Sequence, residues 1–76
     1  MEVHVTLHAG LAKDGKTREQ SVRLVGDQCT LMDVIAALEL SRNAVGLIFV
    51  NDVLKKETKE VFDGDKIAVL PHMEGG

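Results

Sequence analysis

A single amphipathic helix, expected to begin at residue 31, constrains the fold more than any other feature of the sequence. The apolar residues that define its buried face are Leu31, Val34, Ile35 and Leu38. They follow the i, i+3, i+4, i+7 spacing that places side chains on one side of a helix. Thr30 suits the N-cap and Asp33 the positively polarised first turn, and residues 41–43 are expected to end the helix. One helix with one apolar stripe must cover one face of a sheet.

The segments around this helix show the period of two that is typical of strands. Alternation predicts strands at 3–7, 21–25 and 66–70, a β-branched run predicts another at 45–50, and residues 53–54 are expected to add a short edge strand. The connections are interpreted as a polar hairpin loop at 9–18, turns at 26–27, 51–52 and 63–65, and a solvated segment at 55–59. Together these elements predict a compact α+β roll. Its last strand is expected to lie in the centre of the sheet, because residues 67–70 are apolar on both sides.

Length and composition exclude several classes of function. A chain of 76 residues makes one small domain with little room for a water-excluding active site beside its core, which argues against an autonomous enzyme. The net charge of −3 and the scarcity of aromatic residues disfavour nucleic-acid binding. Apolar runs are too short to span a bilayer. The alternating start of the chain does not resemble a signal peptide, so we expect a cytoplasmic protein.

Few side chains offer chemistry of their own. Cys29 is alone, which favours a reducing compartment over a disulfide framework. Just before a helix it is either an activated thiol or a half-buried small residue, and we favour the second interpretation. His4 and His8 share the outward face of the first predicted strand, but no third ligand accompanies them. We therefore expect no metal site.

The last seven residues, LPHMEGG, are the most unusual part of the chain. Pro71 fixes its own φ and biases Leu70 toward extended geometry, which is expected to direct the tail away from the domain. Gly75 and Gly76 have no Cβ, so their backbone can approach another surface closely. Two terminal glycines can equally be a frayed end. We divide the chain into a domain at 1–70 and a tail at 71–76.

Three stretches resemble the ubiquitin-like β-grasp sulfur carriers, a family that includes the small subunit of molybdopterin synthase and the sulfur carrier of thiamin biosynthesis. The DGDKI stretch at 63–67 resembles the turn into the family's last strand, and the Leu70-Pro71 pair followed by Gly75-Gly76 resembles the molybdopterin tail. The short connection from the helix to residues 45–50 resembles the thiamin carrier. The resemblance implies a β-grasp roll, with a mixed sheet of four to five strands and one main helix across one face.

The resemblance also implies a function. An E1-like enzyme would use ATP to adenylate Gly76, and sulfur would then replace AMP to give a thiocarboxylate for a sulfur-accepting synthase. Pro71, His72, Met73, Glu74 and Gly75 would insert into the partner's active site. The carrier itself would bind no cofactor and be a monomer when free. The Leu70-Pro71 tail favours molybdopterin synthesis, with thiamin synthesis second.

A carrier also needs a surface on which its partner docks. If Ile67 and Val69 face the helix, Ala68 and Leu70 face the open side of the sheet, and Ile48 on the neighbouring strand is expected to join them. Two other functions stay open. The chain can be a protein modifier joined to lysines through Gly76, or a passive ubiquitin-like adaptor with an inert tail.

Overall fold

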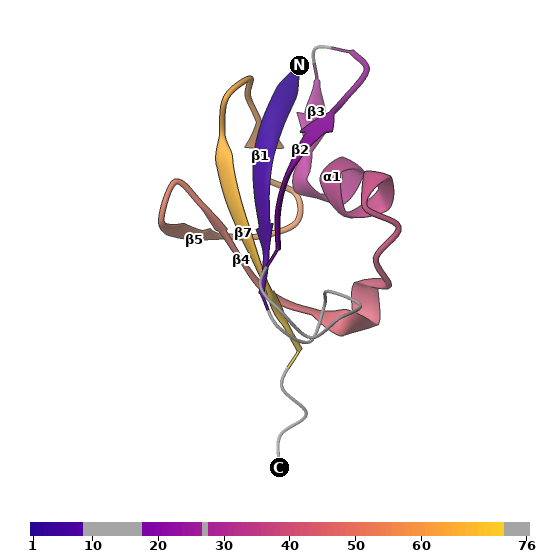
Figure 1. Ribbon diagram of the computed structural model, residues 1–76, viewed down its shortest axis with the longest axis vertical. Helices are drawn as coiled ribbons and strands as arrows, with labels where there is room; N and C mark the ends of the chain where they lie inside the picture. The colour runs from indigo at the N-terminus through magenta and orange to yellow at the C-terminus, as the bar shows by residue number, and fades with distance from the viewer. Residues whose placement is uncertain (9–17, 27, 73–76) are drawn as a thin grey trace.

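The computed structural model of the chain describes residues 1–8, 18–26 and 28–72 (Figure 1). In chain order its elements are β1 (Glu2–Leu7), β2 (Arg18–Arg23), β3 (Cys29–Thr30), α1 (Leu31–Ala37), the 3₁₀ helix η1 (Arg42–Ala44), β4 (Val45–Val50), β5 (Val53–Lys55), β6 (Glu60–Val61) and β7 (Lys66–Pro71). The described residues contain no helix that is long and apolar enough to cross a membrane.

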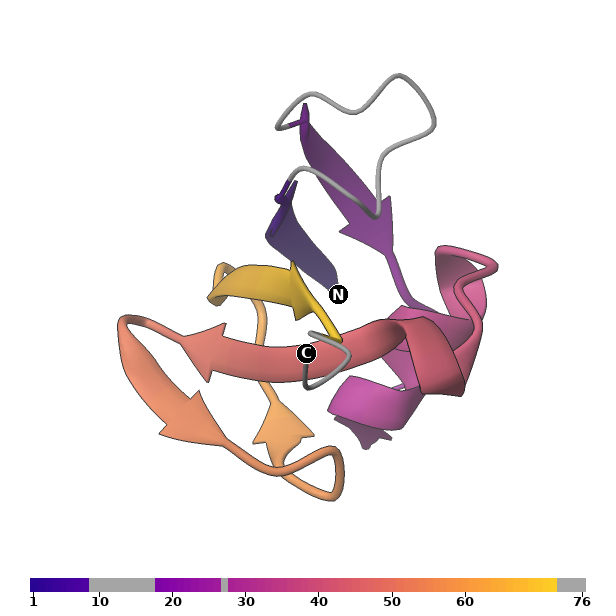
Figure 2. The same cartoon turned by 90° about the horizontal axis from the view of Figure 1, so that it is seen from below.

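The main sheet has five strands in the order β2-β1-β7-β4-β5. β7 lies in the centre, parallel to β1 and antiparallel to β4, which confirms the predicted place of the last strand. Figure 2 shows β7 between β1 and β4, with α1 on one side of the sheet. The predicted mixed sheet with one main helix across one face is therefore confirmed. We call the face turned away from α1 the open face.

The core lies between α1 and the sheet. Its buried residues are Val3, Val5, Leu7, Val22, Leu24, Cys29, Leu31, Val34, Ile35, Ile48, Val50, Val61, Ile67 and Val69. The alternating residues of β1 and β7 are inward-facing, as predicted, and three of the four helical stripe residues are buried. Leu38 packs against the cluster but stays partly exposed. Burial of each such aliphatic side chain stabilises the fold by about 1.5–3 kcal/mol before entropy is counted.

α1 begins as predicted and ends earlier than predicted. The Thr30 amide donates to the Asp33 carboxylate at 2.7 Å, which satisfies a backbone donor at the helix start. The helix stops at Ala37 because Glu39 adopts the left-handed conformation, with φ of 58°, and the Leu40 amide donates to the Ile35 carbonyl. The expectation that residues 41–43 end this helix is wrong, since η1 occupies that stretch as a separate turn.

A second, two-stranded sheet was not predicted. β3 pairs with β6, and each contributes only two residues, too few for an alternation to be recognised. The segment at 55–59 is also more than solvated loop. The amides of Leu31 and Met32, in the first turn of α1, donate to the carbonyls of Lys59 and Glu57. These bonds attach the 55–59 segment to the start of the helix.

The predicted second strand is displaced along the chain. Alternation placed it at 21–25, whereas β2 runs from Arg18 to Arg23. The two residues that the alternation places on one side, Val22 and Leu24, are both buried, although Leu24 lies just after β2. The turns at 51–52 and 63–65 are confirmed, and Gly64 has a φ of 85° that glycine adopts without steric cost. The hairpin loop predicted at 9–18 falls on residues 9–17, outside the described part apart from Arg18.

Candidate functional site

The candidate site begins where β7 reaches the lower end of the sheet in Figure 1. Pro71 is still a strand residue and pairs with Val45 of β4. The His72 amide then donates to the Ala44 carbonyl at 2.7 Å, so the chain remains bound to its neighbour one residue past the strand. Met73, Glu74, Gly75 and Gly76 lie outside the described residues.

The pairing of β7 with β4 is irregular next to this point. Val45 pairs with Pro71 and Leu47 pairs with Leu70, so the register shifts at Gly46, which has no partner of its own. Such a bulge is common where a strand changes direction near a functional site. A hollow of about 330 Å³ lies here, lined by Gly46, Leu47, Leu70, Pro71 and His72.

The open face carries an apolar patch beside this end of β7. Phe49 pairs with Ala68 on one side and with Leu54 on the other, and Leu47 pairs with Leu70. Directly opposed residues of an antiparallel pair share a face. The five residues, which we call the open-face patch, are Leu47, Phe49, Leu54, Ala68 and Leu70. Leu47 is 48% exposed and Leu54 56% exposed, while the other three are partly covered.

The placement of Ile48 on the open face was wrong. Ile48 is 5% exposed and pairs with Val69, which is fully buried, so both side chains point toward α1. Its neighbours Leu47 and Phe49 occupy the open face instead. Ala68 and Leu70 lie on that face as expected, and the structure brings them together with Leu47 and Phe49.

The family model that matches this sequence covers residues 12–76 and describes the ThiS family. The match spans most of the chain and includes both the described end of β7 and the two glycines. The chain belongs to the ThiS family. A comparison with curated protein sequences gave no match.

A solved structure supports the fold of this ThiS-family chain. The alignment of this chain with SAMP1 from Haloferax volcanii, a solved structure, covers 100% of both chains at 24% sequence identity. The two structures superpose with a TM-score of 0.73. This likeness shows that the fold is the ubiquitin-like β-grasp. Membership of the ThiS family supports a small sulfur carrier, and the structural likeness adds the ubiquitin-like fold. Such proteins are generally not enzymes themselves and act with E1-like adenylating enzymes.

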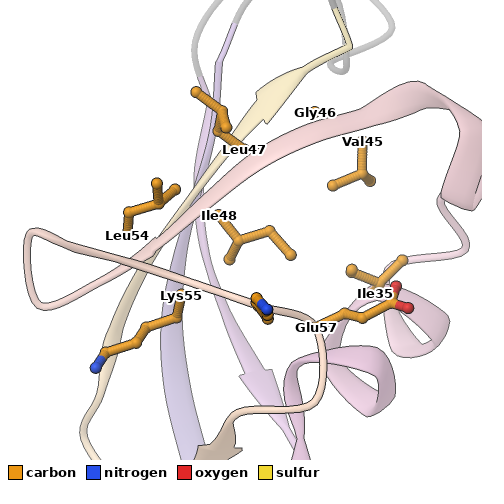
Figure 3. A pocket seen from close by; sticks show the side chains of 9 residues that line it. Ile35, Val45, Gly46, Leu47, Ile48, Leu54, Lys55 and Glu57 are labelled. Atoms are coloured by element: carbon orange, nitrogen blue, oxygen red, sulfur yellow. The ribbon is translucent and has the colours of Figure 1, made fainter.

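A second groove of the ThiS-family domain lies between β4 and the segment that follows β5. It encloses about 560 Å³ and is lined by Ile35, Val45, Gly46, Leu47, Ile48, Leu54, Lys55, Lys56 and Glu57. Figure 3 shows Ile35, Val45 and Ile48 turned toward this hollow, and Leu47 and Leu54 turned away from Ile35. Ile35 and Ile48 belong to the buried core and also line this groove, so its floor is aliphatic.

The remaining candidate residues lie away from the end of β7. Cys29 is 5% exposed, with its Sγ 3.5 Å from the Val25 carbonyl oxygen, which agrees with a small buried residue. His4 lies on the open face, with its Nδ1 3.3 Å from the Ser21 hydroxyl. Among the described residues, no three His, Cys, Asp or Glu side chains are close enough to hold a metal ion.

Leu47, Phe49 and Leu54 are the surface residues that sequence reasoning missed. Alternation showed that Ile48 faces opposite to Leu47 and Phe49, but it could not show which of the two sets faces α1. The full burial of Val69 decides this through its pairing with Ile48. Only the register between β4 and β7 carries that information.

Proposed function

We propose that this protein is a sulfur carrier whose reactive group is the α-carboxylate of Gly76. The observation that carries the proposal is the ThiS-family match through Gly76, joined to a central strand whose end lies at the edge of the fold. The pathway we place first is molybdopterin synthesis, on the strength of the Leu70-Pro71 tail. Thiamin synthesis comes second, because of the short connection between α1 and β4.

The chemistry requires activation, because a carboxylate is a poor electrophile. An adenylating enzyme joins the Gly76 carboxylate to the α-phosphate of ATP and releases pyrophosphate. Hydrosulfide then attacks the carbonyl carbon, so that a C–S bond forms, the C–O bond to AMP breaks and AMP leaves. The product is a thiocarboxylate at Gly76. ATP and the sulfur donor are bound by partners, and this chain contributes the carbonyl carbon.

The fold supplies reach and an anchor for this chemistry. β7 is held on both sides, by β1 and by β4, so the strand that precedes the tail is fixed. Four residues follow His72, and an extended chain of that length spans at most about 14 Å. This is enough for Gly76 to enter a partner's active site while the domain stays outside. The absence of side chains at Gly75 and Gly76 suits a narrow passage.

The open-face patch is the surface on which we propose that the adenylating enzyme docks. It lies beside the end of β7, so a partner that covers it also receives the tail. The corrected set contains Leu47, Phe49 and Leu54 in place of Ile48, together with Ala68 and Leu70. Apolar groups collected on one exposed face commonly mark a protein interface.

Intact mass spectrometry tests the proposal. The chain is produced together with the E1-like adenylating enzyme of its own organism and supplied with ATP and a sulfide source. Replacement of one oxygen by sulfur at Gly76 is the expected mass change, and fragmentation places it on the last residue. A chain carrying a further residue after Gly76 is the control and is expected to stay unchanged.

Other outcomes of the same measurement would decide against the carrier. A mass increase of a whole second protein, with Gly76 linked to a lysine, would identify a protein modifier. An unchanged mass with an active adenylating enzyme, ATP and sulfide present would identify an adaptor with an inert tail.

A further inference from the structure

Among the described glycines, Gly46 is the one at which neighbouring atoms leave no room for a Cβ. Gly26 and Gly64 have room for a Cβ but adopt a positive φ. A Cβ built on Gly46 would lie 2.5 Å from the Pro71 carbonyl oxygen and 2.9 Å from both the Pro71 carbonyl carbon and the His72 Cα. All three are backbone atoms, so no change of rotamer can relieve the overlap. Gly46 itself is exposed and has no positive φ. The core therefore does not demand a glycine here, and neither does a turn.

The atoms that Gly46 meets are the ones from which the tail departs. The pairing register shifts around Gly46, between the pairs formed by Val45 and Leu47. Just beyond the shift, the His72 amide donates to the Ala44 carbonyl at 2.7 Å. The first residues of the tail are thus held by a hydrogen bond from one side of Gly46 and by backbone packing against Gly46 itself.

We infer that Gly46 is a positioning residue, which sets the direction in which the tail leaves the domain by letting β4 approach the backbone of Pro71 and His72. This role rests on the proposed function, because it concerns how Gly76 reaches the adenylating enzyme. With any larger residue at 46, the overlap forces the two backbones apart and the bond from His72 to Ala44 opens. The tail remains attached, but its starting point moves relative to the open-face patch.

Hydrogen exchange tests the structural half of this inference without any partner. In Gly46→Ala, the His72 amide is expected to exchange at least about tenfold faster than in the wild type, because its acceptor is lost. The amides of Ile67 and Val69, deep in β7, serve as internal references and are expected to keep their protection. Unchanged protection of His72 in a folded Gly46→Ala chain would overturn the inference.

Adenylation kinetics with the same E1-like enzyme test the functional half. A misplacement of about 1 Å can reduce a rate by about a hundredfold, so kcat for Gly46→Ala is expected to fall roughly 10- to 100-fold. KM is expected to change little, because the open-face patch is intact. A wild-type kcat, or a raised KM with kcat unchanged, would overturn the positioning role.

A matched control separates positioning from loss of stability. Val61 is fully buried in β6, outside the candidate site, so Val61→Ala destabilises the fold without altering the start of the tail. Its kcat is expected to match the wild type at a temperature where the chain is folded. An equal fall of kcat in Val61→Ala and Gly46→Ala would assign the effect to stability and overturn the inference.

Two further results are informative. If Gly46→Ala folds poorly, it is measured in a background with Glu39→Gly and Asp52→Gly, two substitutions that relieve positive-φ residues away from the tail. Failure to fold there as well would make Gly46 a requirement of the fold and overturn a role confined to the tail. If the wild type is not adenylated, the proposed function fails, and His72 exchange alone decides whether Gly46 holds the start of the tail.

Discussion

The two ends of β7 are built differently. At the Lys66 end, side chains of neighbouring loops are bonded to the backbone. The Asp65 carboxylate accepts from the Phe62 amide at 2.8 Å and from the Asn51 side chain at 3.1 Å. The Asn51 side-chain oxygen accepts in turn from the Lys66 amide at 3.1 Å. Asp63 adds a bond to the start of β1 by accepting from the Glu2 amide at 2.7 Å.

At the Pro71 end, the contacts described for residues 70–72 are made by backbone atoms and apolar side chains. A single backbone bond from His72 to Ala44 continues the ladder, and Gly46 allows the close approach that it needs. The apolar patch beside this end faces outward. The difference indicates that side-chain hydrogen bonds fix the register of β7 at the Lys66 end, while the Pro71 end leaves apolar side chains such as Leu47 exposed.

Removal of the last four residues should give the largest effect on function and almost none on stability. A chain that ends at His72 is expected to lose sulfur loading completely, because no carboxylate reaches the adenylating enzyme. Its free energy of unfolding should change by less than about 0.5 kcal/mol, because the last residues of a domain usually contribute little to its stability. Intact mass and urea unfolding measure the two quantities. A large loss of stability would remove the contrast between the two ends.

Asn51→Ala should produce the opposite result. It removes two hydrogen bonds of the Lys66 end and places alanine at a φ of 51°, so the free energy of unfolding is expected to fall by about 2 kcal/mol. Asn51→Gly loses the same bonds without the conformational cost, so its free energy of unfolding should fall by about half as much. Loading of the folded protein should stay normal in both variants. Urea unfolding gives the first quantity and mass spectrometry the second.

A pair of adjacent residues can show whether a partner docks on the open-face patch beside the Pro71 end of β7. Leu54 and Val53 are similarly exposed, at 56% and 52%, but Leu54 belongs to the open-face patch and Val53 pairs with Val50 on the other face. Leu54→Asp is expected to weaken binding of the adenylating enzyme about tenfold, because a charge would be buried in the interface. Val53→Asp should leave the affinity unchanged. Equal effects in calorimetric titration would refute docking through this patch.

The smallest expected effect is a gain in stability at the turn that carries Asn51. Asp52 has a φ of 70° in a two-residue hairpin turn, where Asn-Gly is the preferred pair. Asp52→Gly is therefore expected to raise the free energy of unfolding by about 0.5–1 kcal/mol, measured by urea unfolding. A decrease would show that the Asp52 side chain contributes a contact at this end.

Much of the fold could be predicted because the patterns are local. The start of α1, the strands β1, β4 and β7, and the turn at Gly64 each follow from spacing or from a residue suited to its conformation. The end of α1 could not be predicted, since Glu39 has no intrinsic preference for the left-handed region. β3 and β6 could not be predicted either, because two-residue strands form only where distant segments meet.

The sequence by itself determined the architecture and the candidate reactive terminus, because periodicity, the single helix and the glycine pair are properties of neighbouring residues. Tertiary structure alone decided which face Ile48 occupies, how β4 approaches Pro71, and why position 46 has no side chain. These depend on the register between strands that are distant along the chain, and a shift of one residue reverses every face. The proposed docking surface and the start of the tail were therefore defined only when β4 was placed beside β7.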